Sequence, residues 1–381
     1  MISVTECLDS ASSKPDKGWR QYNSRFDVGT YRSRDGKFKT RVKTQFLSPG
    51  ITYTVNFVFK FAAQEVGNCE LIGLIYKLQG DAESSVSHLA YKREDGWWMA
   101  ELYQFTSDHR IVDLEILFDG SLHCIEAEGI EFLPLEKVEH KDGKQPISDS
   151  DANWEQKLPV DYENIMKRSK NSVQYATKKE AYEIMRKGFL VTYDKRSIWF
   201  SLDKNGKKCH MLSARASSIS AGTYPEWLSF PESRFGEAIH SCNNGCSFNT
   251  SVQYQLLSSN TTYASYLVYK LPKNQTRFEA PVRVYDNLCR SGDATRYIYL
   301  SSPQTPVIRQ KADQNTHNPP NTCMTKGLPQ QRNDGWMEVQ IWEFEITANA
   351  TNVIPMDLSL RNYGDNWLTG MIIEGLEFRP I

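Results

Sequence analysis

The sequence contains four blocks that recur in the same order. The segment L-S-P-G-I-T-Y-T-V-N-F-V-F-K at 47–60 matches L-S-S-N-T-T-Y-A-S-Y-L-V-Y-K at 257–270. The other blocks of the two copies are S-R-F at 24–26 and 233–235, D-G-W at 95–97 and 334–336, and E-G-[I/L]-E-F at 128–132 and 374–378. Because four ordered motifs do not recur by chance, we interpret the chain as a duplicated domain.

The repeated blocks alternate their side chains in the way that strands do. In the second Tyr block, Tyr263, Leu267 and Tyr269 fall on one face, whereas Tyr266 and Lys270 fall on the other. The Asp-Gly pair before the tryptophan of each D-G-W block predicts a turn that leads into a strand. Short alternating strands with polar loops and little helix predict an all-β chain, built as two antiparallel β-sandwich, jelly-roll-like domains.

These patterns divide the 381-residue chain into four parts. We predict a first domain at 1–140, an acid-rich linker at 141–160, a helix–hairpin preface at 161–215 and a second domain at 216–381. Copy one is expected to have no counterpart to the preface, because its S-R-F block begins at residue 24. A proline-rich insertion before the second D-G-W block predicts a surface loop.

The preface carries local signals for one helix and one hairpin. Thr177 and Glu180, in T-K-K-E, form a capping-box pattern at the start of the helix. Gly188 is suited to end that helix. The runs F-L-V-T-Y-D at 189–194 and I-W-F-S-L-D-K-N-G-K at 198–207 predict two strands, with a β-hairpin at Asn205-Gly206.

Composition and charge exclude several classes of protein. The formal net charge of −1 gives no general attraction to nucleic acid or anionic lipid, and no long apolar stretch predicts a membrane span. The N-terminus lacks the basic and apolar regions of a signal peptide, so we expect a protein that is not secreted and whose cysteines are reduced. Cys242 and Cys246 lack a second pair at zinc spacing and no catalytic constellation is complete, so we expect no metal, no cofactor and no enzymatic activity.

Several motifs of the chain together carry a family resemblance. They are P-E-S-R-F at 231–235, the Leu-Ser…Tyr block, N-D-G-W-M-E at 333–338 and W-L-T-G-M-I-I-E-G-L-E-F-R-P at 367–380. With these motifs the chain resembles the phloem protein 2 family, the Nictaba-like plant lectins, over nearly all of 154–381 and more loosely over 18–140. The resemblance implies a cytoplasmic or nuclear, non-enzymatic carbohydrate-binding protein of plant stress or defence. It implies GlcNAc oligomers or the N-glycan cores of glycoproteins as ligands.

The sugar site of this family uses tryptophans just before the S-R-F block, where sugar C–H faces pack on aromatic rings. On this sequence, the resemblance implies a carbohydrate-binding site at Tyr224, Glu226 and Trp227, with Trp19 as the counterpart in copy one. Ala221 stands where a further tryptophan is expected. Because this cluster contains fewer tryptophans than the family pattern, a second interpretation stays open. In it, the chain is a protein-interaction module of a signalling protein, and sugar binding is lost. Relatives of this type can carry an F-box or a kinase, and neither is recognisable in this sequence.

Two pairs of residues allow both a functional and a structural interpretation. Trp97 and Trp336 could line a groove, but a tryptophan after an Asp-Gly turn more often fills a sandwich core. Glu374 and Glu377 could be paired as the acid and base of a glycosidase, but carboxylates on the polar face of a strand are the commoner case. We therefore predict core positions for the tryptophans and no catalytic role for the carboxylates.

Overall fold

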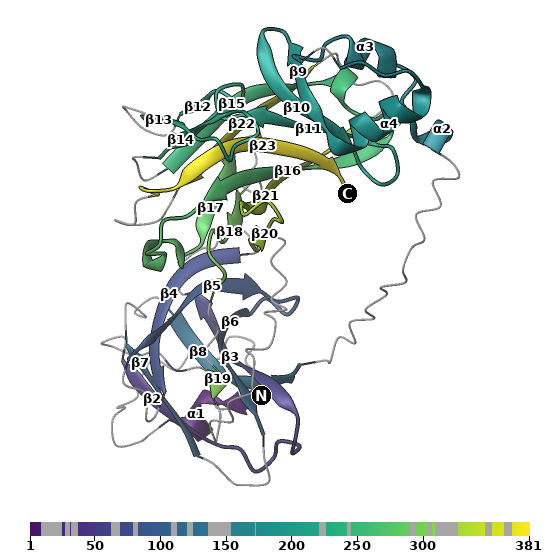
Figure 1. Ribbon diagram of the computed structural model, residues 1–381. Coiled ribbons are helices and arrows are strands. Elements are labelled where there is room, and N and C mark those ends of the chain that lie inside the picture. The colour runs from purple at the N-terminus through teal and green to yellow at the C-terminus, as the bar shows by residue number, and fades with distance from the viewer. Residues whose placement is uncertain are drawn as a thin grey trace. The chain divides into compact units, whose positions relative to one another are not determined.

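The computed structural model describes residues 1–8, 25–26, 31, 37–61, 69–78, 83–107, 113–119, 125–135, 154–171, 173–220, 226–241, 245–289, 295–303, 307–308, 327–346, 353–361 and 368–381. The chain forms two compact units: Met1–Lys141 with Gln304–Cys323 (unit 1), and Asp142–Pro303 with Met324–Ile381 (unit 2). Strands dominate both units (Figure 1), which confirms the predicted all-β class. Within the described ranges, no helix is both long enough and apolar enough to cross a membrane.

Unit 1 is built on one continuous sheet with the strand order β1-β8-β3-β6-β5-β4-β7-β2. Its elements are β1 (Ile2–Ser3), α1 (Val4–Cys7), β2 (Phe38–Lys43), β3 (Thr52–Phe61), β4 (Cys69–Leu78), β5 (Ser85–Lys92), β6 (Trp98–Thr106), β7 (Asp113–Asp119) and β8 (Ile125–Pro134). Phe57 of β3 lies 5.0 Å from Phe118 of β7 between ring centroids, so the two halves of the sheet share one core. Two residues of the insertion, β19 (Val307–Ile308), pair in parallel with β6.

Unit 2 contains two sheets. The larger has the order β20-β21-β16-β23-β11-β10-β9 with the hairpin β13–β14 attached to β23, and the smaller has the order β12-β15-β22-β17-β18. Their elements are β9 (Phe189–Tyr193), β10 (Arg196–Leu202), β11 (Lys208–Ser213), β12 (Ile219–Ser220), β13 (Glu226–Ser229), β14 (Glu237–His240), β15 (Gly245–Gln253), η3 (Tyr254–Leu256), β16 (Thr261–Lys270), η4 (Thr276–Phe278), β17 (Val282–Asp286), β18 (Thr295–Ile298), β20 (Gln330–Gln331), β21 (Met337–Ile346), β22 (Val353–Arg361) and β23 (Ile372–Pro380). Leu376 of the larger sheet and Leu358 of the smaller belong to one core, which is the arrangement of a β-sandwich.

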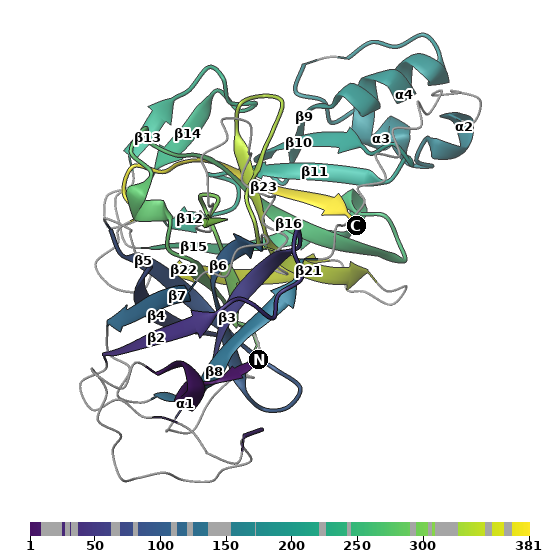
Figure 2. The same ribbon diagram turned by 90° about the horizontal axis from the view of Figure 1, so that it is seen from below.

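The helices α2 (Trp154–Lys157), α3 (Tyr162–Met166) and α4 (Lys178–Lys187) lie at the β9–β10 end of the larger sheet (Figures 1 and 2). The predicted capping box is present at α4. Thr177 Oγ1 accepts a hydrogen bond from the backbone N of Glu180 at 3.2 Å, and the Glu180 carboxylate accepts one from the N of Ala176 at 2.7 Å. β10 and β11 form the hairpin predicted at Asn205-Gly206. Because β11 pairs with β23, the strands of the preface extend the sheet of unit 2.

The repeated sequence blocks hold equivalent places in the two units. Tyr53 of β3 lies opposite Pro134, and Tyr263 of β16 lies opposite Pro380. The tyrosine is counted as the first residue of each block. The register of the central strand against β6 or β21 then shifts after the third residue, and its register against β8 or β23 shifts after the sixth. The strand order β2-β7-β4-β5 of unit 1 recurs as β15-β22-β17-β18 in unit 2.

Unit 1 also contains a counterpart to the end of β11. β1 pairs with β8 through Ile2 and Ser3, in the register in which β11 pairs with β23 through Leu212 and Ser213. The expectation that copy one has no counterpart to the preface is therefore wrong for its last residues. The match of M-I-S to M-L-S is too short to be recognised without the strand pairing.

Candidate functional site

Trp227 lies on β13, in the hairpin that β13 and β14 add to the larger sheet of unit 2. It stands opposite Ile239 in this hairpin, is partly buried and packs against the core of the unit. Glu226 precedes it on the same strand. Tyr224 and Trp19 lie outside the described residues, so the structure places two of the four residues predicted for the sugar site.

A guanidinium group covers one face of the Trp227 indole. Cζ of Arg215 lies 4.0 Å from the ring centroid, and the Glu237 carboxylate accepts hydrogen bonds from Arg215 Nε at 3.0 Å and Nη2 at 2.8 Å. These hydrogen bonds raise the pKa of Arg215 and lower that of Glu237, so both groups are charged at neutral pH. Sugar stacking on this face of the indole therefore requires Arg215 to move aside.

A second pair of polar groups completes this surface. Glu226 and His240 lie directly opposite each other in the hairpin, with Glu226 Oε2 3.2 Å from His240 Nδ1. The Glu226 side chain is 61% exposed. We call Arg215, Glu226, Trp227, Glu237 and His240 the Trp227 cluster. It combines an aromatic ring with exposed hydrogen-bond donors and acceptors, which are the groups that bind the faces and hydroxyls of sugars.

Sequence reasoning finds Glu226 and Trp227 but misses the other three members of the cluster. Glu237 and His240 belong to β14, and their place beside Trp227 depends on the pairing of β13 with β14. Arg215 follows β11 and reaches the indole only once the sheet has formed. The excess of Lys and Arg over Asp and Glu in residues 161–215, 13 against 6, is the single sequence signal that includes Arg215, and it gives no position.

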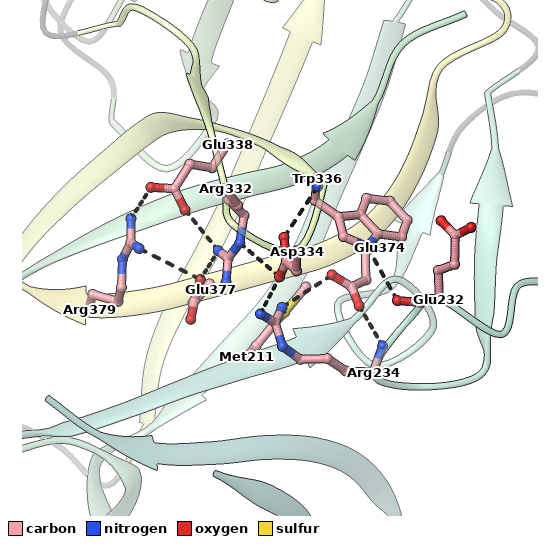
Figure 3. Close-up of polar contacts among 10 residues, drawn as sticks. All are labelled: Met211, Glu232, Arg234, Arg332, Asp334, Trp336, Glu338, Glu374, Glu377 and Arg379. Carbon is pink, nitrogen blue, oxygen red and sulfur yellow. Dashed lines mark hydrogen bonds and ion pairs between the residues drawn. The ribbon is translucent and has the colours of Figure 1, made fainter. Parts of the chain in front are cut away.

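The repeated motifs meet in unit 2 as a network of charged side chains (Figure 3). Arg234, from the S-R-F block, donates from its backbone N to Glu374 Oε1 at 2.7 Å and from Nη1 to Oε2 at 3.3 Å. Its Nη2 lies 2.7 Å from Oδ2 of Asp334. One arginine thus links the S-R-F turn to the D-G-W turn and to the closing strand β23.

Arg332 forms the second centre of this network. Its Nε lies 3.3 Å from Asp334 Oδ2, and its Nη1 lies 2.8 Å from Glu338 Oε2 and also contacts Glu377. Burial disfavours the charged guanidinium, but the negative charges of Glu377 and Glu338 outweigh burial and raise the pKa of Arg332. Arg379 Nη2 lies 2.6 Å from Glu338 Oε1. The carboxylates and guanidinium groups therefore neutralise one another in a chain of contacts that joins β21 and β23 to the turns beside them.

The two carboxylates considered for glycosidase chemistry are both part of this network. Glu374 is fully buried, and burial raises the pKa of its carboxyl, an effect that the contacts with Arg234 offset only in part. Glu377 pairs with Arg332 and Arg379. Because arginines occupy both groups, this geometry supports a structural role for them.

The same network recurs in unit 1. The backbone N of Arg25 donates to Glu128 Oε1 at 2.9 Å. Arg25 and Arg93 both pair with Asp95, and Arg93 also pairs with Glu131. The repeated residues thus join the S-R-F segment, the D-G-W turn and the closing strand within each unit.

The tryptophans of the two D-G-W blocks are core residues, as predicted. Trp97 is 2% exposed and Trp336 is 1% exposed. A lysine of the central strand lies above each ring, with Lys60 Nζ 4.3 Å from the Trp97 centroid and Lys270 Nζ 4.9 Å from that of Trp336. Because both rings are buried, neither indole has a face that a ligand could contact.

Among the side chains that the structure describes, no group of three or more His, Cys, Asp or Glu is arranged to hold a metal ion. Cys246 is buried, and burial raises the pKa of its thiol to about 12. Cys242 lies outside the described residues.

Comparison with known proteins agrees with this architecture. Residues 207–380 match the family model of phloem protein 2. An F-box protein of Arabidopsis thaliana is 32% identical over 239 residues, which cover 61% of this chain and 69% of the relative. The chain belongs to the phloem protein 2 family. F-box protein PP2-B10 of the same plant is 31% identical over 240 residues, with 61% of this chain and 80% of that protein covered. The domain of this family is lectin-like.

Proposed function

We propose that this phloem protein 2 chain is a non-enzymatic carbohydrate-binding protein, and that unit 2 binds sugar at the Trp227 cluster. The observation that carries the proposal is the placement of one indole beside Arg215, which follows β11, and among the polar groups of the β13–β14 hairpin. The apolar C–H face of a pyranose would contact the indole, while Arg215 donates to sugar oxygens and Glu226 accepts from hydroxyls.

GlcNAc oligomers or N-glycan cores of glycoproteins are the ligands we propose. An acetamide group offers a carbonyl oxygen, which is an acceptor for the guanidinium of Arg215. We further propose that the chain acts in the cytoplasm or nucleus, in stress or defence, and that the two units are copies of one domain. The equivalent registers and charge networks of the two units support the duplication.

The affinity of such a site is expected to be low. A cation–π contact at an exposed site is worth about 0.5–1 kcal/mol, and a sugar on the covered face of Trp227 must replace the contact with Arg215. A dissociation constant near 1 mM corresponds to about −4 kcal/mol. A second site in unit 1 at Trp19 would add avidity.

A glycan array on the full chain, followed by calorimetric titration of N-acetylglucosamine oligomers, tests this proposal. Trp227→Ala should abolish binding and Arg215→Gln should change it, and the melting temperature of each variant shows whether unit 2 is still folded. Trp342→Ala is the matched control, because Trp342 is also partly buried in unit 2 but lies on β21. Binding that survives Trp227→Ala, or that is lost equally with Trp342→Ala, would contradict the site.

A second candidate function is supported by the contact of the Arg215 guanidinium with the Trp227 indole. The bidentate pair between Arg215 and Glu237 holds the guanidinium on the indole, which suits a protein-recognition surface in which sugar binding is lost. The relatives named above are F-box proteins. We propose that this chain shares with them a domain that recognises other proteins. An empty glycan array, together with Trp227-dependent capture of one defined protein from deglycosylated plant extract, would favour this candidate.

The absence of enzymatic activity is tested separately. The full chain is incubated with chitin oligomers or with ATP, and the products are examined by mass spectrometry. We expect no turnover, because arginines occupy the carboxylates Glu374 and Glu377. Turnover that Glu374→Gln or Glu377→Gln abolishes would refute this part of the proposal.

A further inference from the structure

The smaller sheet of unit 2 carries two arginines and two tyrosines on the face that is turned away from the core. Arg283 of β17 lies opposite Tyr297 of β18 and opposite Arg361 of β22. Tyr285 lies two residues after Arg283 on the same strand and therefore points to the same side. We call these four residues the Arg–Tyr face. Their neighbours along the strands are buried in the core: Val282, Val284, Ile298 and Leu360.

The two tyrosine hydroxyls hold the guanidinium of Arg283. Its Nη1 donates to the hydroxyl of Tyr285 at 2.8 Å, and its Nε and Nη2 both donate to that of Tyr297, the first at 3.1 Å. Burial disfavours the charge of Arg283, but these hydrogen bonds raise its pKa, so the group is charged at neutral pH. A guanidinium has five N–H donors. Those that the tyrosines do not use are left for a ligand.

The second arginine of the face stands directly beside the first. Cζ of Arg361 lies 5.7 Å from the ring centroid of Tyr285, and its side chain is exposed. Among the residues that the structure describes, no carboxylate forms an ion pair with Arg283 or Arg361. Two positive side chains opposite each other on neighbouring strands repel. An anion bound between them would be attracted by both.

The remaining charges of these strands do not cancel the two arginines. The described strands β15, β17, β18 and β22 contain three arginines and two aspartates, and no lysine, histidine or glutamate. The third arginine, Arg296, lies opposite Val284 and so belongs to the other face of the sheet. Asp286, at the end of β17, accepts a hydrogen bond at 3.0 Å from the backbone N two residues further on.

The second aspartate gives the face an acceptor at some distance from the arginines. Asp357 of β22 is two residues from Ser359, which lies opposite Tyr285. The side-chain amide of Asn287 donates to Asp357 Oδ1 and to Ser359 Oγ, both at 2.8 Å. Asp357 is half-buried, and its other carboxylate oxygen can accept a hydrogen bond from a ligand hydroxyl.

The corresponding face of unit 1 has a different chemistry. There β4, β5 and β7 take the places of β17, β18 and β22 in the strand order. This face carries exposed aliphatic side chains, with Ile75 37%, Val86 44% and Leu117 45% exposed. Because aliphatic groups offer no hydrogen bond to an anion, we expect the binding described next in unit 2 and not in unit 1.

We propose that the Arg–Tyr face binds an acidic oligosaccharide through the carboxylate of a hexuronic acid residue. The carboxylate accepts hydrogen bonds from Arg283 and Arg361, and the pyranose ring packs on Tyr285. Sugar hydroxyls donate to Asp357. A sulfate group offers the same charge to the arginines but has no hydrogen to donate to this aspartate. The face lies on the smaller sheet, whereas the Trp227 cluster belongs to the larger one, so the two sites are independent.

Calorimetric titration of the full chain with trigalacturonate at neutral pH tests the proposal. Binding should be saturable, with one site per chain, because the proposed face exists in unit 2 alone. The fully methyl-esterified trisaccharide has the same rings without the charge, and it should bind at least about tenfold more weakly, since a hydrogen bond between charged groups is worth that factor. Added salt should weaken the binding of trigalacturonate and leave that of the ester unchanged.

Substitutions locate the site. Arg361→Gln should weaken the binding of trigalacturonate about tenfold or more for the same reason, and Tyr285→Thr about threefold or more through loss of the ring. Arg186→Gln is the matched control, because Arg186 is also exposed but lies on α4, which packs on β10 of the larger sheet. It should change nothing. Melting temperatures show that each variant is folded, and Arg361→Gln should bind N-acetylglucosamine oligomers as the unchanged chain does.

Four results would overturn the proposal. They are the absence of saturable binding of trigalacturonate, equal binding of its methyl ester, equal weakening by Arg361→Gln and Arg186→Gln, and binding of inorganic sulfate or phosphate as tight as that of trigalacturonate. Binding of trigalacturonate that Trp227→Ala abolishes and Arg361→Gln leaves intact would also overturn it, because the acid would then bind at the Trp227 cluster. Failure of N-acetylglucosamine oligomers to bind affects the Trp227 cluster alone.

Discussion

The hydroxyl of Tyr263 offers a test that compares the two units directly. In unit 2 it accepts a hydrogen bond from the backbone N of Ser258 at 2.8 Å and donates one to the carbonyl O of Lys208 at 2.8 Å. In unit 1 the hydroxyl of Tyr53 accepts from the N of Ser48 at 3.0 Å. The second bond is specific to unit 2, because its acceptor belongs to the part of β11 that has no counterpart among the described residues of unit 1.

The cost of removing each hydroxyl follows from these contacts. A hydrogen bond contributes about 1 kcal/mol, and a buried group left without a partner adds to the loss. Tyr263→Phe should therefore destabilise unit 2 by about 2 kcal/mol, and Tyr53→Phe should destabilise unit 1 by about 1 kcal/mol. At about 2–4 °C per kcal/mol for domains of this size, unit 2 should melt about 4–8 °C lower.

Hydrogen exchange followed by mass spectrometry measures each unit separately within the full chain. Exchange of β16 should accelerate about 30-fold in Tyr263→Phe, and that of β3 about fivefold in Tyr53→Phe, since 1.4 kcal/mol is a factor of ten. Tyr266→Phe is the control, because Tyr266 lies on β16 and is only partly buried. Equal losses in the two units, or a change below about 0.5 kcal/mol in Tyr263→Phe, would refute the reasoning.

Three further predictions concern unit 2. Gly375→Ala should destabilise it by about 1–3 kcal/mol in urea unfolding, because a Cβ would lie 1.9 Å from the carbonyl O of Leu212 on β11; unchanged stability would contradict this close approach. Thr177→Ala should cost about 1 kcal/mol through loss of the α4 cap, seen as faster amide exchange of that helix alone. Burial lowers the pKa of His210 to about 3, so the unfolded chain binds a proton from about pH 6.5 downward that the folded chain does not. Stability should fall below that pH by up to about 1.4 kcal/mol per pH unit, and urea titrations at pH 5 and pH 7 should show a smaller difference for His210→Phe.

Local sequence patterns were sufficient to predict several strands and turns and the start of one helix. Alternation in the Tyr blocks, Asp-Gly before Trp97 and Trp336, and the cap at Thr177 each depend on residues a few positions apart, so the sequence contains the whole signal. The four repeated blocks likewise predict that two similar folding units exist. The core positions of Trp97 and Trp336 follow from the same patterns, because the turn directs the next residue inward.

Tertiary structure alone decided which polar residues meet. Arg234 lies 100 residues from Asp334 and 140 from Glu374. The pairing of β14 with β23, of β23 with β16 and of β16 with β21 brings them together. Arg215 covers Trp227 for a similar reason, since this contact depends on how β14 joins β23. The sequence by itself determined the strands and turns, which are local properties. Strand pairing over long separations determined the charge networks and the contact of Arg215 with Trp227, because a pattern of residues does not specify which distant backbone lies beside it.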